Sequence, residues 1–322
     1  MKRITTLVLA AAVGLFALAS QAQDWPEKTV RVINPFNPGG TTDILARVVA
    51  DKLQKRTGKP FVVEAKPGAG GMIGTSQVAK AEPDGHTIGV SIAGPLVLNR
   101  LLYKSMTYDP QKDLTPLTFG VHQPCMLIAN KSLGVSSVSE LIALVKKNPG
   151  KFNYGYVGNG SLGHLVMAML AEKSGTQIVP ILYGAAPPAA LALLAGDVHM
   201  ACLPASVAYG QVKGGGVTAL AVSTEARTRL LPNLPTIHEQ GYPDIVGSAW
   251  IGFVGPAGLP KALTERISRE IGGVLREPEV VETLRQQFME PAPTTPEEFR
   301  RFMADQLQKW MPVIEQNNIR AD

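Results

Sequence analysis

The sequence predicts an α/β protein, and two features of the chain carry that prediction. Short β-branched runs alternate with amphipathic helical segments between residues 29 and 223, and glycine-rich turns separate them. The 322 residues are 45% apolar and 18% charged, as expected of a chain that buries a large core. Strands that alternate with helices usually pair in parallel and are covered on both faces, so we expect mostly parallel sheets.

The elements follow one another in a regular order. Residues 29–34 are β-branched and end in a glycine-rich turn, which predicts a strand and a loop. Apolar residues at helical spacing from Ile44 to Leu53 then predict a helix that Gly58 ends. The further predicted strands are residues 61–64, 87–92, 115–121, 126–129, 152–157, 177–182, 198–202 and 217–223. The further predicted helices are residues 76–80, 138–147, 162–174 and 187–195.

Beyond residue 223 the chain is rich in proline, and residues 249–254 predict one more strand. The chain then closes with two or three amphipathic helices. The last of them carries large apolar residues, Phe299, Trp310 and Ile314 among them, at helical spacing. A stripe of this kind predicts a helix that packs against the core.

The first 22 residues have the pattern of a cleavable signal peptide. Lys2 and Arg3 form a basic start, residues 4–19 are apolar but too short for a comfortable membrane span, and Ala22 precedes the predicted cleavage site. The alternative is an uncleaved anchor, which the polar residues immediately after Ala22 disfavour. We therefore expect an exported protein.

Charge and cysteine content exclude several classes of protein. A formal net charge of +5 is too small for a nucleic-acid footprint, and no basic stripe with interleaved aromatic residues is present. The two cysteines, Cys125 and Cys202, lie in apolar contexts without metal spacing. They are interpreted as buried small hydrophobic residues or as a long-range disulfide. No Walker A, H-E-x-x-H or EF-hand pattern occurs, so we expect no cofactor and no metal.

Two turns between a strand and a helix have the composition of an anion site. In α/β sheets ligands bind beyond the carboxyl ends of strands, where amides at helix N-termini favour negative charge. The first turn is residues 38–43, whose glycines allow close backbone approach and whose threonines could cap the helix. The second is residues 158–164. Ordinary capping turns are the alternative interpretation of both.

The second turn also suggests two kinds of enzyme, and neither fits well. Gly158, Gly160 and Gly163 match G-x-G-x-x-G, but the next predicted strand ends without the acidic residue that would hold a ribose. Ser161 and His164 suggest a hydrolase, but a nucleophile elbow needs a glycine two residues before the serine. A third turn, at Tyr183, has two interpretations. Either the tyrosine hydroxyl contacts a ligand, or this is an ordinary turn with a half-buried tyrosine.

A set of short motifs follows a specific order and spacing along the chain: residues 32–40 with Asp43, 67–71 with 73–74, 83–85, 102–103, 108–110, 153–154, 158–161 with His164, and 220–223. Through these motifs the sequence resembles a known family, the periplasmic solute-binding proteins of tripartite tricarboxylate transporters, often called Bug receptors. The resemblance covers essentially the whole mature chain.

The resemblance implies a type II periplasmic binding protein, in which crossing hinge strands join two α/β domains around a ligand cleft. Domain 1 is then expected to comprise residues 23–121 and 223–322, and domain 2 residues 122–222. Hinges are expected near residues 119–123 and 219–223. The family usually captures small carboxylates, so the resemblance implies a receptor without enzymatic activity.

The resemblance also implies which residues line the cleft. The domain-1 half is expected to be Phe36, Asn37, Gly39, Gly40, Thr41, Thr42 and Asp43, with Ser91 and Gly94 as further wall. The domain-2 half is expected to be Gly158, Asn159, Gly160, Ser161, His164, Tyr183 and Leu203.

This chain departs from the family pattern at two of these places. Where the family commonly reads Pro-Tyr-Lys-Gly, this chain has Leu182-Tyr183-Gly184-Ala185, so a lysine is missing. The family also commonly has an acidic residue at the position that aligns with Leu203. Loss of the cation disfavours a second carboxylate, and loss of the acid disfavours an ammonium group. The hypothesis is a ligand with one dominant carboxylate and an otherwise less polar body, such as an aromatic one.

The sequence therefore predicts a monomeric receptor that captures a small organic carboxylate and delivers it to membrane subunits of a transporter. Two alternatives stay open at this stage. The loaded receptor could instead dock on a signalling ectodomain as a sensor, or Ser161 and His164 could act as a hydrolase.

Overall fold

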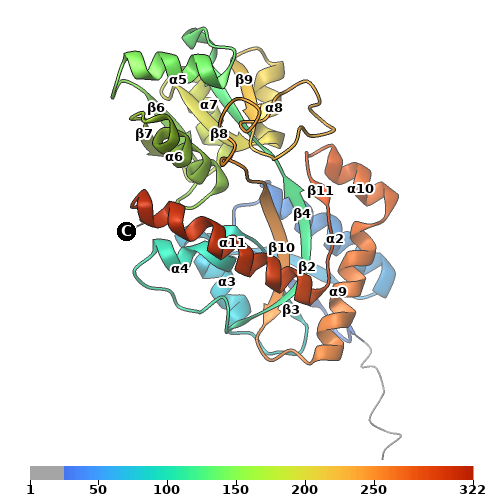
Figure 1. Cartoon of the computed structure of the whole chain (residues 1–322). Coiled ribbons are helices and arrows are strands. Elements are labelled where there is room, and N and C mark those ends of the chain that lie inside the picture. The colour runs from blue at the N-terminus through green and yellow to red at the C-terminus, as the bar shows by residue number, and fades with distance from the viewer. Residues whose placement is uncertain (1–24, 322) are drawn as a thin grey trace, which may run out of the picture.

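The computed structural model describes residues 25–321 as two α/β domains, each built on its own sheet (Figure 1). One sheet has six strands in the order β11-β4-β10-β3-β1-β2, and the other has five in the order β7-β6-β8-β5-β9. The predicted signal peptide and its cleavage site lie outside the described residues. Within residues 25–321 no helix is long and apolar enough to cross a membrane.

The six-stranded sheet takes its strands from both ends of the chain. They are β1 (Val30–Asn34), β2 (Phe61–Ala65), β3 (Thr87–Ile92), β4 (Leu114–Gln123), β10 (Ala249–Pro256) and β11 (Glu290–Pro291). Its helices are α2 (Thr41–Thr57), η2 (Ala69–Gly71), α3 (Met72–Ala79), η3 (Gly94–Leu98), α4 (Asn99–Leu102), α9 (Lys261–Leu275), α10 (Pro278–Arg285) and α11 (Pro296–Gln316). We call this unit domain 1.

The five-stranded sheet comes from the middle of the chain. Its strands are β5 (Cys125–Asn130), β6 (Asn153–Tyr156), β7 (Val179–Leu182), β8 (Met200–Pro204) and β9 (Val217–Val222). Its helices are η4 (Lys131–Leu133), α5 (Val138–Lys147), α6 (Leu162–Ser174), α7 (Ala186–Ala195) and α8 (Ala205–Lys213). We call this unit domain 2; the domain boundaries given above stay predictions.

The expectation of mostly parallel sheets holds only in part, because both sheets are mixed. β1 pairs in parallel with β2 and β3, and β6 with β7 and β8. However, β10 runs antiparallel to both β3 and β4, and β5 runs antiparallel to both β8 and β9. The strands next to the domain crossing belong to the antiparallel set, since the chain enters domain 2 after β4 and returns to domain 1 at β10.

Local signals place most helices where the sequence predicts them. α5 and α6 have the predicted bounds, and α2 ends at Gly58, whose left-handed backbone (φ 69°) only glycine adopts without strain. Helix α8 is an addition, absent from the predicted elements. It begins directly after β8 and contains Gly210, so its sequence carries a weak helical signal.

The domain-2 sheet is covered on both faces, as expected. Along β8 the side chains of Met200 and Cys202 enter one apolar cluster, and those of Ala201 and Leu203 enter another on the opposite face. Cys125 and Cys202 are both buried and are not joined by a disulfide. The structure thus favours the interpretation of two buried small hydrophobic residues.

Ser223 ties the strands together where the chain crosses between the domains. Its fully buried hydroxyl accepts a hydrogen bond from the amide of Cys125 (3.2 Å) and donates to the carbonyl of Gly247 (2.8 Å). The backbone of Ser223 pairs with the same two residues. Both crossing segments are therefore joined at one point, within the predicted hinge region.

Candidate ligand-binding site

The loop between β1 and α2 is held by the buried carboxylate of Asp43. Its Oδ2 accepts hydrogen bonds from the Gly39 amide (3.0 Å) and Arg47 Nε (2.8 Å), and its Oδ1 accepts one from Asn34 Nδ2 (3.3 Å). Burial raises the pKa of Asp43, but these hydrogen bonds and the Arg47 charge outweigh that effect and lower it overall. Asp43 therefore shapes the loop, and three donors already occupy its oxygens.

The same loop presents the N-terminus of α2 at the surface. Asn37, Gly39 and Gly40 are exposed, whereas Thr42 is buried. The N-cap residue is Gly40, and no side chain caps the first turn, so the interpretation of the threonines as caps is wrong. Amides without a side-chain cap at an exposed helix N-terminus are suited to bind an anion.

Phe36 packs beneath this loop against a second glycine-rich segment. A Cβ on Gly71 would lie 2.9 Å from Cζ of Phe36 and 2.6 Å from Cγ of Pro95. Gly71 also has φ 89°, so both its conformation and its surroundings require glycine. Asn99 Nδ2 donates to the carbonyl of Gly70 (3.2 Å) and fixes the segment from the other side. The glycines of residues 68–71 therefore support the Phe36 loop, a structural role that the family resemblance at these residues does not by itself reveal.

The expected wall residues Ser91 and Gly94 lie at the end of β3 and in η3. The hydroxyl of Ser91 is buried, and within residues 25–321 it has no hydrogen-bond partner. A Cβ on Gly94 would lie 3.1 Å from Oδ1 of Asn99, so this glycine adjoins the residue that holds the second glycine-rich segment. Both residues therefore belong to the same end of the domain-1 sheet as the Phe36 loop.

In domain 2, the turn before α6 is organised by Ser161 and His164. The Ser161 hydroxyl accepts a hydrogen bond from the His164 amide (3.4 Å) and caps the helix. The Gly160 amide donates to Nδ1 of His164 (3.3 Å). Burial lowers the pKa of His164 to about 4, so the imidazole is neutral at pH 7. Because Nδ1 accepts a hydrogen bond, the proton of the neutral ring is on Nε2.

Tyr156 completes this turn. Its ring stacks on His164 with 4.3 Å between centroids and 24° between planes. Its hydroxyl donates to Oδ1 of Asn159 (2.8 Å). Gly158 is half-buried, and a Cβ there would meet no atom within 4 Å. The turn is thus rigid at Asn159 and open at Gly158.

The geometry around Ser161 gives the hydrolase interpretation no support. The hydroxyl is used as an acceptor by the His164 backbone, and Nδ1 of His164 is occupied by the Gly160 amide. Within residues 25–321 no hydrogen bond joins the Ser161 hydroxyl to the imidazole ring, which a serine nucleophile and its base require.

Tyr183 and Leu203 differ in their placement. Tyr183 is half-buried, and its ring lies 3.4 Å from the position of a Cβ on Gly155, beside β6. Leu203 is fully buried in the domain-2 core. Its side chain packs among apolar neighbours, so its role at a ligand stays a prediction.

The two halves of the predicted site approach each other at α4. A Cβ on Gly160 would lie 2.2 Å from Cδ1 of Leu102, so this glycine lets a domain-1 side chain contact the domain-2 turn. Further along α6, Glu172 Oε2 accepts a hydrogen bond from Asn317 Nδ2 (2.8 Å), just after α11. The domains thus touch on the side where the predicted site residues lie.

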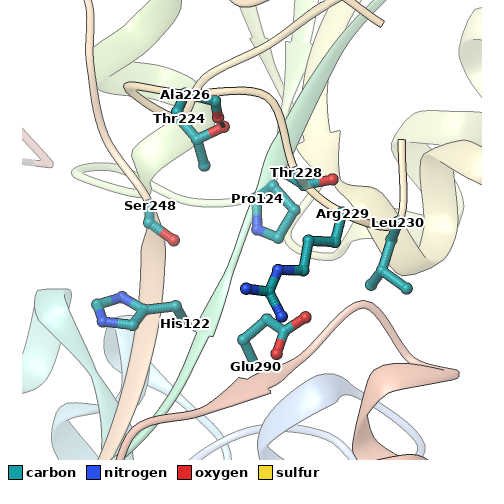
Figure 2. Close-up of a pocket in the computed structure, with 9 residues that line it drawn as sticks. All are labelled: His122, Pro124, Thr224, Ala226, Thr228, Arg229, Leu230, Ser248 and Glu290. Carbon is teal, nitrogen blue, oxygen red and sulfur yellow. Dashed lines mark hydrogen bonds between the residues drawn. The ribbon is translucent and has the colours of Figure 1, made fainter. Parts of the chain in front are cut away.

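A cavity of about 270 Å³ lies elsewhere, on the other side of the crossing strands (Figure 2). Its lining includes none of the predicted site residues. Its walls are His122, Pro124, Thr224, Ala226, Thr228, Arg229, Leu230, Ser248 and Glu290. In the domain-1 sheet, β1 and β3 precede predicted site loops and lie on the opposite side of β4 and β10 from β11. In the domain-2 sheet, β6 precedes the other site loop and lies on the opposite side of β5 from β9. The cavity is therefore separate from the predicted ligand cleft.

The amino-acid sequence matches a known protein family and several of its members. Residues 45–319 match the TctC family, described as "Tripartite tricarboxylate transporter family receptor". The chain is similar to protein BugT of Bordetella pertussis, with 34% identity over 313 residues, which are 95% of this chain and 96% of the relative.

Two solved structures are similar to this chain over most of its length. Rpa4515 of R. palustris, solved with adipate, has a TM-score of 0.87 and 32% identity, and covers 92% of this chain and 99% of its own. MatC from Rhodopseudomonas palustris, solved with bound malate, has a TM-score of 0.81 and 27% identity, with coverages of 90% and 100%. The predicted two-domain fold and family are confirmed. The chain therefore belongs to the TctC, or Bug, family of periplasmic receptors for tripartite tricarboxylate transporters.

Proposed function

We propose that the protein binds a small organic carboxylate between the β1–α2 loop and the β6–α6 turn, and delivers it to the membrane subunits of a tripartite tricarboxylate transporter. The observation that carries the proposal is the exposed N-terminus of α2. Its amides have no side-chain cap, and the Asp43 carboxylate fixes the loop that leads to them.

The domain-2 half supplies complementary polar groups. His164 is neutral and carries its proton on Nε2, so it can donate a hydrogen bond without adding charge. Ligand contacts with both domains would favour the closed arrangement through motion at the crossing strands. The adipate and malate in the related structures support a carboxylate as the ligand class.

The turn that follows β7, at Tyr183 and Gly184, favours a ligand with one dominant carboxylate. A Cβ on Gly184, which replaces the common lysine of the family, would meet no atom within 4 Å. The position therefore offers space and no cation. Binding of benzoate more tightly than malate would support this part of the proposal, and equal affinities would remove its basis.

The experiment is a thermal-shift panel on the protein without residues 1–22. The panel contains mono-, di- and tricarboxylates, aromatic acids, amino acids, and neutral amides of the same acids. A ligand at about 100 times its Kd adds about 2.7 kcal/mol, which raises the Tm by about 4 °C in a protein of this size. A selective shift by an acid but not by its amide supports the proposal, and a shift by neutral compounds alone refutes the carboxylate site.

A matched pair of variants tests the place of binding. A Cβ on Gly40 would meet only the Asn37 carbonyl oxygen at 3.6 Å, so Gly40→Ala should fold but obstruct access to the amides. Gly214→Ala, whose Cβ would meet backbone oxygens at 3.5 Å far along the chain in domain 2, is the control. We expect the acid-induced shift to fall in Gly40→Ala and to persist in Gly214→Ala. Equal shifts in both would place the ligand elsewhere.

A further inference from the structure

Phe288 of domain 1 lies in the hydrophobic core of domain 2. It stands between α10 and β11, and β11 pairs with β4 in the domain-1 sheet. Its side chain is nevertheless buried in an apolar cluster formed by the domain-2 strands and helices. Every other buried residue of this cluster that the structure describes lies between residues 126 and 222. The ring centroid is 4.9 Å from that of Tyr209 in α8, with 57° between the ring planes.

The backbone places Phe288 just after the C-terminal end of α10. Its amide donates to the Arg285 carbonyl (2.8 Å) and the Met289 amide donates to the Leu284 carbonyl (3.0 Å), which is the hydrogen-bond pattern of a helix C-cap. Its φ is +56°, the left-handed conformation that this cap requires and that glycine usually supplies. The cap therefore fixes the backbone within domain 1, and the ring reaches Tyr209 of domain 2 from it.

A polar bridge lies directly beside the ring. Gln123, at the end of β4, is buried, and its Nε2 donates to Ser206 Oγ in domain 2 (3.2 Å) and to the Gln287 carbonyl in domain 1 (3.1 Å). One side chain at the crossing thus holds the residue before Phe288 and a residue of α8. The apolar insertion and the polar bridge join the same two segments.

The cavity behind the crossing strands lies next to this insertion. Glu290, two residues after Phe288, forms one wall, and Figure 2 shows Arg229 on the facing segment pointing toward it. Leu230 lines the cavity and also packs against the cluster that holds Phe288. A space of about 270 Å³ thus separates the β11 segment from the segment of residues 224–230 beside this insertion.

We propose that Phe288 is an interdomain wedge that holds the two domains in the arrangement seen here. Rotation at the crossing strands away from this arrangement has to withdraw the ring from its place against Tyr209. Phe288 therefore controls the balance between hinge states without touching the ligand. This inference rests on the hinge motion of the proposed function, but its test needs no ligand.

The test measures the interdomain distance by double electron–electron resonance. Spin labels are placed at Glu82→Cys and Lys151→Cys, two exposed positions that precede β3 and β6 and so lie away from the predicted cleft. The native cysteines are each 2% exposed and escape labelling. An aromatic pair in a core is worth about a 2- to 12-fold change in an equilibrium, so Phe288→Ala should change the ratio of the distance populations by that factor.

Matched variants separate the wedge from ordinary destabilisation. Tyr209→Ala should reproduce the shift, and the double variant should add little to it, because both substitutions remove one contact. Phe288→Gly, which relieves the backbone strain, should shift the populations as Phe288→Ala does. Phe61→Ala breaks an aromatic pair with Trp25 inside domain 1 and should lower the Tm without moving the interdomain distance. A wild-type distance distribution in Phe288→Ala, or independent effects of the Phe288 and Tyr209 substitutions, would overturn the proposal.

Discussion

Replacing His164 by Phe should remove a large part of the acid sensitivity of the protein. Burial lowers the pKa of His164 from 6.5 to about 4, so the unfolded chain takes up a proton before the folded protein does. The contribution of the neutral imidazole to stability is therefore complete above pH 6.5 and is lost as the pH falls toward 4. From these two pKa values the wild-type protein should lose about 2 kcal/mol between pH 7 and pH 5 through this one group.

The assay is urea unfolding at both pH values for three proteins. His164→Phe keeps a ring against Tyr156 but cannot titrate and leaves the Gly160 amide without its acceptor, so it should start about 1 kcal/mol less stable at pH 7. Its further loss at pH 5 should be about 2 kcal/mol smaller than that of the wild type. Tyr156→Phe keeps the titrating group and should retain the wild-type pH dependence. An equal loss in His164→Phe and wild type would refute the reasoning.

The remaining predictions concern glycine packing, the domain crossing and the first loop. Gly163→Ala should lower the Tm by several degrees in scanning fluorimetry, because its Cβ would lie 2.0 Å from the Cys202 carbonyl oxygen. Gly158→Ala, with open space around it, should leave the Tm unchanged, and equal Tm losses would contradict this account. Ser223→Ala should cost about 2 kcal/mol in urea unfolding, since its buried hydroxyl makes two hydrogen bonds; a loss near zero would show that they are replaced. Asp43→Asn should destabilise most at neutral pH and progressively less toward pH 3, because the pKa of Asp43 is lowered and its carboxylate contributes only above that pKa; a pH-independent difference would count against the ionised form.

The sequence predicts the element order well because most boundaries depend on local chemistry. Gly58 ends α2 through its left-handed conformation, and Ser161 caps α6 as its position suggests. Strand direction is a property of the whole chain, and the antiparallel strand β10 follows from the return of the chain between domains. Neither the hydrophobic periodicity of residues 249–254 nor any turn residue beside them predicts the direction of this strand.

The site shows the same division between local and long-range information. Glycine-rich turns suggest where backbone amides are accessible, and the structure leaves Gly39 and Gly40 exposed and Gly158 half-buried, whereas Gly160 is buried. The family resemblance implies that Asp43 lines the cleft, whereas its contacts in the loop depend on Arg47 one turn along the helix and on Asn34 across the loop. The insertion of Phe288 into domain 2 joins distant segments and leaves no local signal in the sequence.

The central claim is that one carboxylate is held between the two glycine-containing loops. Amide hydrogen exchange, measured with and without the acid that gives the largest thermal shift, tests it most directly. The account predicts ligand-dependent protection in both residues 39–43 and residues 158–164. Protection confined to residues 224–230, which line the separate cavity, would contradict it.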